Sequence, residues 1–219
     1  MEQMVFDFLT RLEKNNNRDW FKDHKAEFEL AKAKADHFFR EMYVSLSEMD
    51  ELEPLKIFRI YKDVRFSADK TPYKTHFSAQ MGRLKPHNRG GCYLQLQPGN
   101  SFLAIGFWEP NKEDLFRIRK EFELDDEFEN ILKEASLKEV FSTLVGDELK
   151  TAPKGFDKTH ERIHLIRKKQ FLLIRNFSDK EVMDKDFIQT ICKSYAAAKP
   201  FVNYFTNVLT TNLNGEVTL

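Results

Sequence analysis

One stretch of the chain, residues 59–76, gathers side chains that could do chemistry. It holds two arginines, three lysines, two aspartates, two tyrosines, a serine and a histidine, with few aliphatic residues between them. Such a run is too polar for a core strand and too patterned for an arbitrary loop. We therefore expect the functional site of the protein to lie here.

The cations of this stretch fit an anionic ligand. Arg59 and Arg65 carry planar, permanently charged groups that match phosphate or carboxylate. Lys70 and Lys74 add point charges. The other predicted ligand-binding residues supply oxygen atoms: Ser67, Asp69 and Tyr73. Together they predict a site for a small ligand that bears phosphate or carboxylate.

Acid–base catalysis has two candidates in the same stretch, Asp63 and His76. Histidine titrates near neutral pH, and a positioned carboxylate can accept a proton. If the protein is an enzyme, which the sequence leaves open, phosphoester chemistry is the first hypothesis. We predict no cofactor and no metal ion, because Asp63, Asp69 and His76 do not have the spacing of a known metal site.

The same residues also fit a purely structural role. Asp63 can pair with Arg65, and Asp69 can cap a turn, so that the cluster would hold the loop to the sheet without any ligand. The protein would then be a non-enzymatic adaptor or a nucleic-acid-associated module. In that case exposed aromatic side chains such as Tyr93 or Trp108 would matter more than the arginines.

A second motif, residues 160–164, matches the HExxH pattern of zinc-dependent hydrolases. On a helix the two histidines would lie one turn apart and could bind zinc, with Glu161 as the base. However, the segment is short, Arg162 introduces a charge, and no clear third ligand follows. We interpret this motif as a coincidence.

The composition restricts the class of protein. The 219 residues include 35 basic and 35 acidic side chains, so the formal net charge is zero and a general attraction to nucleic acid or anionic membranes is not expected. No signal peptide and no apolar run of about 18 residues is present. Cys92 and Cys192 lack metal or redox spacing. We expect a soluble cytoplasmic protein without membrane contact, whose oligomeric state stays open.

The element expected to position the site is a strand over residues 55–66. Its apolar residues share one parity and would face the core: Phe58, Ile60, Val64 and Phe66. Residues of the other parity would share the opposite face: Arg59, Tyr61, Asp63 and Arg65. This common face is the main structural basis of the site hypothesis.

The rest of the pattern predicts an α+β fold. Alternating segments predict further strands at residues 75–83, 92–97, 101–108 and 170–177. Helical periodicity and caps predict helices at 4–13, at 18–49 with a bend near 32–35 or as one piece, at 111–122, at 125–135, within 159–167 and from 178 onward, with Pro200 kinking or splitting the last. The abundant phenylalanines, 21 in all, predict a phenylalanine-rich core.

We therefore expect a mostly antiparallel central sheet of about four to five strands, packed by N-terminal and C-terminal helices. One domain would span residues 1–219. Its parts would be N-terminal helices at 1–52, a sheet region at 53–110, and a C-terminal helical region with one strand at 111–219.

Several motifs together resemble a known family. They are Asn15-Asn16-x-Arg18-x-Trp20-Phe21, the stretch 59–76, Gly90-Gly91-x-Tyr93-Leu94 with the following Pro98-Gly99-x-Ser101, Pro153-x-Gly155-Phe156, and Lys169-x-Phe171. Over nearly its whole length the chain resembles the bacterial and fungal conserved-hypothetical family known as domain of unknown function 2461 (DUF2461). The resemblance implies an intracellular α+β domain with no assigned activity. The chain departs from the family pattern at Tyr61-Lys62, where a second arginine is frequent, and at Glu161, where proline is common.

Overall fold

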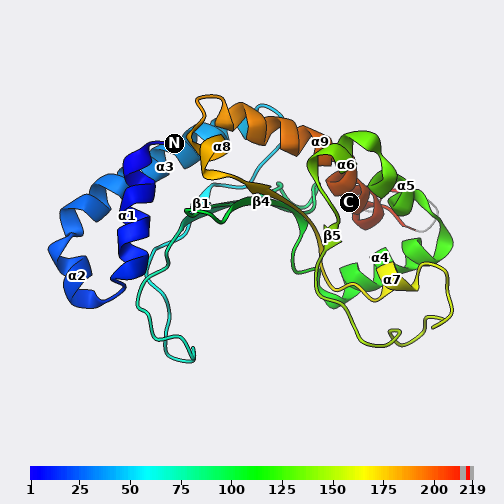
Figure 1. Ribbon diagram of the computed structural model, residues 1–219. Helices are drawn as coiled ribbons and strands as arrows, with labels where there is room; N and C mark the ends of the chain where they lie inside the picture. Colours follow the sequence, from blue (N-terminus) through cyan, green and yellow to red (C-terminus); the bar gives the residue numbers. More distant parts are fainter. Residues whose placement is uncertain (213–215, 218–219) are drawn as a thin grey trace.

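The structure is a computed structural model that describes residues 1–212 and 216–217. Its centre is one antiparallel sheet with the strand order β1-β2-β3-β4-β6-β5 (Figure 1). The longer strands are β2 (Phe77–Gly82), β3 (Gly91–Leu96), β4 (Ser101–Phe107) and β6 (Phe171–Phe177). The α+β class is confirmed. The described sheet has six strands because it also includes two-residue strands, β1 (Lys56–Ile57) and β5 (Leu144–Val145).

The sheet has one covered face and one open face, which follow from the alternation of side chains along its strands. Leu94 and Leu96 of β3 pack into the hydrophobic core. Tyr93 and Gln95 have the opposite parity and share their face with the residues that pair with them on β2 and β4. We call this second face the open face. The alternation predicted for β2 and β3 is thus confirmed.

The N-terminal helices are α1 (Gln3–Lys14), α2 (Arg18–Asp23) and α3 (Lys25–Ser47). Asn17 caps α2, since its side chain accepts a hydrogen bond from the N–H of Trp20 at 2.9 Å. The predicted bend near residues 32–35 is wrong, because the break lies at His24. The His24 ring folds back onto α2, stacking on Trp20 with 4.0 Å between ring centroids.

The C-terminal half supplies a lobe and a long helix. The lobe contains α4 (Lys112–Leu124), α5 (Glu127–Lys133), α6 (Ala135–Val140) and α7 (Ile163–Ile166). The short α8 (Asp179–Met183) starts with the predicted capping box, and α9 (Phe187–Thr210) follows. Pro200 does not split α9. The carbonyl four residues earlier belongs to exposed Ala196, so water can take the place of the missing N–H.

Phenylalanine side chains form much of the core, as predicted. On α9, Phe201 and Phe205 contact each other with centroids 5.3 Å apart. Phe205 also packs on Phe171 of β6 and Phe128 of α5, at 5.1 and 5.4 Å. These contacts bind the lobe, the sheet and α9 together through aromatic burial.

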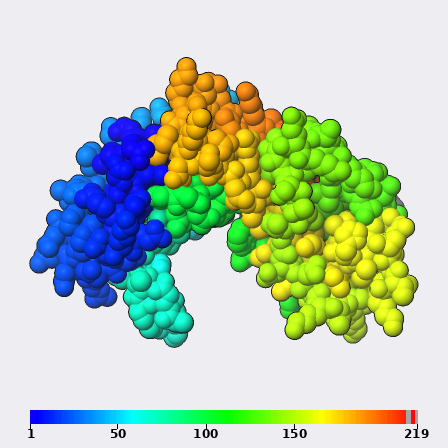
Figure 2. Space-filling model, in the orientation of Figure 1, coloured from blue at the N-terminus to red at the C-terminus, as the bar shows by residue number. Residues whose placement is uncertain are grey.

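The molecule has the shape of an arch (Figure 1). Helices α3, α8 and α9 lie above the sheet, while the loop after β1 and the α4–α7 lobe descend on either side of it. The space-filling view shows the hollow between these two sides (Figure 2). Among the described residues no helix is long and apolar enough to cross a membrane.

The predicted strand over residues 55–66 is wrong beyond Ile57. From Phe58 to His76 the chain leaves the sheet as a long loop, which we call loop 58–76. Its two arms are held together by backbone hydrogen bonds from Lys74 N to Ile60 O (2.7 Å) and from Lys62 N to Pro72 O (2.9 Å). Ile60 is buried as predicted, whereas Phe58 lines a cavity on the open face instead of packing into the core. Phe66 near the tip is 96% exposed, because no partner strand reaches it.

A buried ion pair joins the end of β2 to the helices. Arg83, 3% exposed, donates from Nε to Asp50 Oδ2 at 2.8 Å. Its guanidinium also donates to Asn203 Oδ1 at 2.7 Å and to Thr206 Oγ1 at 2.9 Å, both on α9. The Tyr195 hydroxyl donates to the same Asp50 oxygen at 2.9 Å. This network links the segment after α3, strand β2 and helix α9.

Replacing Asp50 with alanine would leave the Arg83 guanidinium buried without its counter-charge. We expect the free energy of unfolding to fall by about 3–5 kcal/mol, the range for breaking one side of a buried pair. Glu29→Ala, which removes an exposed pair with Lys25 at 2.7 Å, should cost at most about 1 kcal/mol. Urea denaturation of both variants measures the difference. Equal losses would show that the buried network does not stabilise the fold specifically.

Candidate functional site

An aromatic row crosses the open face of the sheet. The rings of Phe58 and Tyr93 have centroids 6.0 Å apart, and those of Tyr93 and Phe102 are 5.7 Å apart. Phe58 comes from the first residue of loop 58–76, Tyr93 from β3 and Phe102 from β4. Among the described elements, Figure 1 shows no helix directly below the centre of the sheet, and the three rings line a cavity on this face, so they offer flat apolar surface to the hollow.

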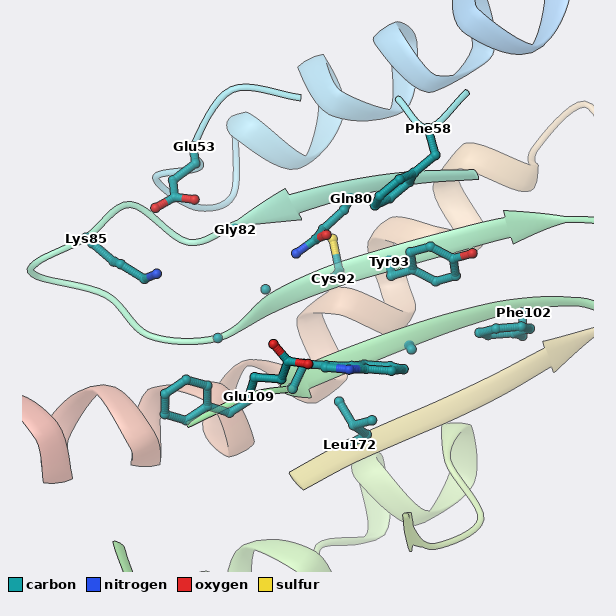
Figure 3. A pocket seen from close by; sticks show the side chains of 16 residues that line it. Glu53, Phe58, Gln80, Gly82, Lys85, Cys92, Tyr93, Phe102, Glu109 and Leu172 are labelled. Atoms are coloured by element: carbon teal, nitrogen blue, oxygen red, sulfur yellow. The ribbon is translucent and has the colours of Figure 1, made fainter. Parts of the chain in front are cut away.

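A cavity of about 680 Å³ lies on this face, with the aromatic row along one part of its lining. Trp108, which is 51% exposed, also lines it. The polar side chains of the lining are Glu53, Gln80, Lys85, Tyr93 and Glu109. Figure 3 shows Glu53 and Lys85 around the end of β2, with Tyr93 and Phe102 farther along their strands. The cavity thus combines flat apolar surface with both kinds of charge.

One end of the cavity has a lining of bare backbone. Gly82 pairs with Gly91, and Gly91 pairs with Gly106, so three glycines stand side by side on adjacent strands. We call them the glycine strip. A Cβ on Gly91 would lie 2.5 Å from the Met81 carbonyl oxygen, and Gly106 has a φ of +149°, which favours glycine. Close strand packing requires these glycines, and as a consequence the cavity has a flat backbone surface.

Cations gather beside Phe58, the lining residue at the other end of the cavity, although they are not themselves part of the lining. The ammonium groups of Lys56 and Lys74 both lie over the Phe58 ring, 5.0 and 5.2 Å from its centroid. Partial burial and the charge of Arg59 lower the pKa of Lys74. Within the described chain neither Lys74 nor Arg59 has a carboxylate within ion-pair distance. We call Arg59 and Lys74 the cationic pair. Asp63 interacts with Arg59 electrostatically without forming an ion pair with it, and two neighbouring cations favour an anion nearby.

His76 stands where loop 58–76 enters β2 and is partly buried. Burial, together with the charges of Lys74 and Lys62, lowers its pKa to about 4. The imidazole is therefore neutral at neutral pH, so it can accept a hydrogen bond or a proton.

The tip of loop 58–76 is held by its own charges. Asp63 pairs with Arg65 at 2.6 Å, and Lys62 pairs with Asp69 at 2.7 Å. Hydrogen bonds from Arg65 lower the pKa of Asp63. Lys70 Nζ donates to a backbone carbonyl of the tip at 3.1 Å. These exposed contacts match the alternative hypothesis for this stretch, in which the charged cluster holds the loop without any ligand.

The nine predicted site residues are thus divided between three places. Arg59, Lys74 and His76 lie at the base of the loop. The tip contains Asp63, Arg65, Ser67, Asp69 and Lys70. Tyr73 is buried instead, with its ring stacked on Phe21 at 3.9 Å between centroids. The common strand face predicted for Arg59, Asp63 and Arg65 does not exist, because the strand ends before them.

The HExxH segment does not form one helix. α7 comprises only Ile163–Ile166, so His160 lies outside it and its Nδ1 accepts a hydrogen bond from Arg162 N at 3.1 Å. His164 Nε2 is 3.6 Å from Glu129. In the part of the chain that the structure describes, no three histidine, cysteine or acidic side chains cluster as metal ligands would. The motif therefore lacks the helical geometry with which its two histidines bind zinc in zinc hydrolases.

Sequence reasoning missed the carboxylate of Glu53 and the glycine strip. Glu53 N donates to Gly82 O at 2.8 Å, an attachment that only the paired backbone reveals. Gly90 and Gly91 are typical of a hairpin turn, and nothing local indicates that Gly106 stands next to them. The sequence signal that was available is the position of Tyr93 in the alternation of β3, which places its side chain on the face opposite the core.

The depressed pKa of His76 predicts a pH dependence. Between pH 6.5 and about 4 the unfolded chain binds a proton at this residue and the folded chain does not, so stability should fall as the pH falls through that window. His76→Gln should flatten this part of the profile. Denaturation midpoints across pH 4–7 measure it, and identical slopes in both proteins would contradict the buried neutral imidazole.

The comparisons with known proteins concern the whole chain. A family model described as "Conserved hypothetical protein (DUF2461)" matches residues 4–204, which include the sheet, loop 58–76 and the lining of the cavity. No curated protein and no solved structure matches the chain. The match covers far more than half of the sequence and confirms the resemblance of the motifs, so the chain belongs to the DUF2461 family.

Proposed function

We propose that this protein binds a small anionic ligand, one that carries phosphate or carboxylate, on the open face of its sheet. The observation that carries the proposal is the cationic pair. Burial and the charge of Arg59 lower the pKa of Lys74, and neither cation has a carboxylate at ion-pair distance among the described residues. Keeping such charges together opposes folding unless an anion offsets them.

The position of the pair supports the same function. Lys74 lies over Phe58 at the edge of the aromatic row, so a ligand anchored there would extend over Tyr93 and into the cavity. Pockets for small molecules combine mostly apolar walls with a few convergent polar groups, which describes this cavity. Lys56 adds a third cation beside the same ring.

The proposal includes phosphoester chemistry only because His76 could act as its acid–base group. A neutral imidazole next to Lys74 can take a proton from water or a hydroxyl group near a bound phosphate. Asp63, the other candidate, pairs with Arg65 in the exposed tip, which supports a structural role for it.

The adaptor function has its own supporting observation, the tip of loop 58–76. Its two carboxylates pair with Lys62 and Arg65, and Phe66 is 96% exposed beside them. A rigid projecting loop with a bare aromatic ring fits a contact with a macromolecule. The two functions use different parts of the loop, so separate variants can test them.

Anion binding is tested with phosphate, sulfate and dicarboxylates by thermal shift. Binding to the folded state should raise the melting temperature by mass action. The rise should disappear in Lys74→Ala and Arg59→Ala. It should persist in Lys180→Ala, an exposed lysine on α8 at the helical side of the sheet, and in Arg65→Ala, which alters only the tip.

The opposite pattern would show that the cationic pair does not bind the anion. If Arg65→Ala abolishes the rise and Lys74→Ala keeps it, the anion binds at the tip. If no anion stabilises the wild type at millimolar concentration, the search moves to macromolecular partners of the tip.

A further inference from the structure

We infer that the anionic ligand is a nucleotide, with its phosphate at the cationic pair and its base over the glycine strip, where guanine fits best. This inference rests on the proposed function and names the ligand class of the same site. It is carried by three features of the cavity: its length, its flat surfaces, and the arrangement of charge along it.

The length of the cavity fits a molecule with a charged group at one end and a ring at the other. The Phe58 N–H bonds to Ser78 O, and Gly82 lies four residues farther along β2. At about 3.3 Å per residue the two ends are separated by about 13 Å. A nucleoside mono- to triphosphate covers such a span, and the volume of about 680 Å³ lies within the usual range for ligands of this size.

The surfaces of the cavity fit a flat ring. Gly91 and Gly106 of the glycine strip present backbone without side chains, so a planar base can approach them closely, while the Glu53 side chain lies over Gly82 beside them. Trp108 and Tyr93, which line the same cavity, supply aromatic faces on which a base can stack. Inorganic phosphate or a small dicarboxylate would leave these surfaces unused.

The charged groups differ between the two ends: Lys56 and Lys74 lie beside Phe58 at one end, whereas Glu53 and Lys85 line the other. The Glu53 side chain lies over Gly82, where an added Cβ would come within 3.0 Å of its Cδ. Its carboxylate is partly buried and has no hydrogen-bond or ion-pair partner among the described residues. A second phosphate would be repelled here, whereas a group with N–H donors would be attracted.

Bases differ in what they can offer this carboxylate. Guanine presents two adjacent donors, its ring N–H and its amino group, which a carboxylate can accept together. Guanine also has a carbonyl oxygen beside these donors, which Lys85 can reach as a donor from the same lining. Adenine has only its amino group to offer on that edge and would leave one carboxylate oxygen unpaired.

Isothermal titration calorimetry of the full chain with GMP, AMP, guanosine and ribose 5-phosphate tests the inference. We expect GMP to bind at least tenfold more tightly than AMP or ribose 5-phosphate. Glu53→Gln should abolish the preference for GMP and leave ribose 5-phosphate binding unchanged. Lys74→Ala should weaken GMP and ribose 5-phosphate alike, bringing GMP to the level of guanosine. Glu139→Gln, an exposed carboxylate on α6, is the matched control and should bind as the wild type does.

The outcomes separate this inference from the function on which it rests. If GMP and ribose 5-phosphate bind equally tightly, the base contributes nothing, so the ligand is not a nucleotide although the anion site is retained. Guanosine binding as tightly as GMP would overturn the anion site. If single-stranded oligonucleotides bind much more tightly than GMP, the ligand is a nucleic acid and not a mononucleotide. Absence of binding by all four compounds would overturn both proposals.

Discussion

The buried pair of Arg83 and Asp50 is the constraint on which the arrangement of the sheet depends. A guanidinium that is 3% exposed has to satisfy its donors inside the protein, and the acceptors come from α9 and from the segment after α3. Arg83 NH1 also donates to the Arg89 carbonyl at 3.3 Å, and Arg89 N donates to Thr206 at 3.0 Å. The β2–β3 connection is therefore attached to α9, and this attachment positions Lys85 and the glycine strip at the end of the cavity.

A second constraint comes from covering the sheet on one side only. The long helices that pack on the sheet, α3 and α9, lie on the face opposite the hollow (Figure 1). Phe58, Tyr93 and Phe102 contact one another on the other face and line the cavity. Antiparallel sheets commonly have one solvated face, but that face is usually polar. Here aromatic rings occupy part of it, which is why we place the proposed ligand site there.

Local patterns of the sequence predict much of the fold. The caps at Asn17, Asn111 and Ser178 and the alternation in β2 and β3 follow from neighbouring residues, and the structure contains them. The failure at residues 55–66 has a physical reason: alternation describes a strand only where another strand pairs with it, and beyond Ile57 none does. The pairing of Gly91 with Gly106 and of Arg83 with Asp50 depends on long-range contacts, which a single sequence does not encode locally.

The charged stretch at residues 59–76 was open to two interpretations, and we assign them to different parts of one loop. At the tip both carboxylates pair with cations, and Lys70 donates to a backbone carbonyl, so these groups have partners without a ligand. At the base, Asn16 hydrogen-bonds the backbone of Tyr73 from both directions, at 2.9 and 3.1 Å, and so fixes the neighbouring Lys74 beside Arg59. Within the described chain no carboxylate lies at ion-pair distance from Lys74 or Arg59, which is why we propose the binding site at the base of the loop. Since a purely structural cluster gains stability from pairing, the base of the loop is the part of this stretch that structure alone does not explain.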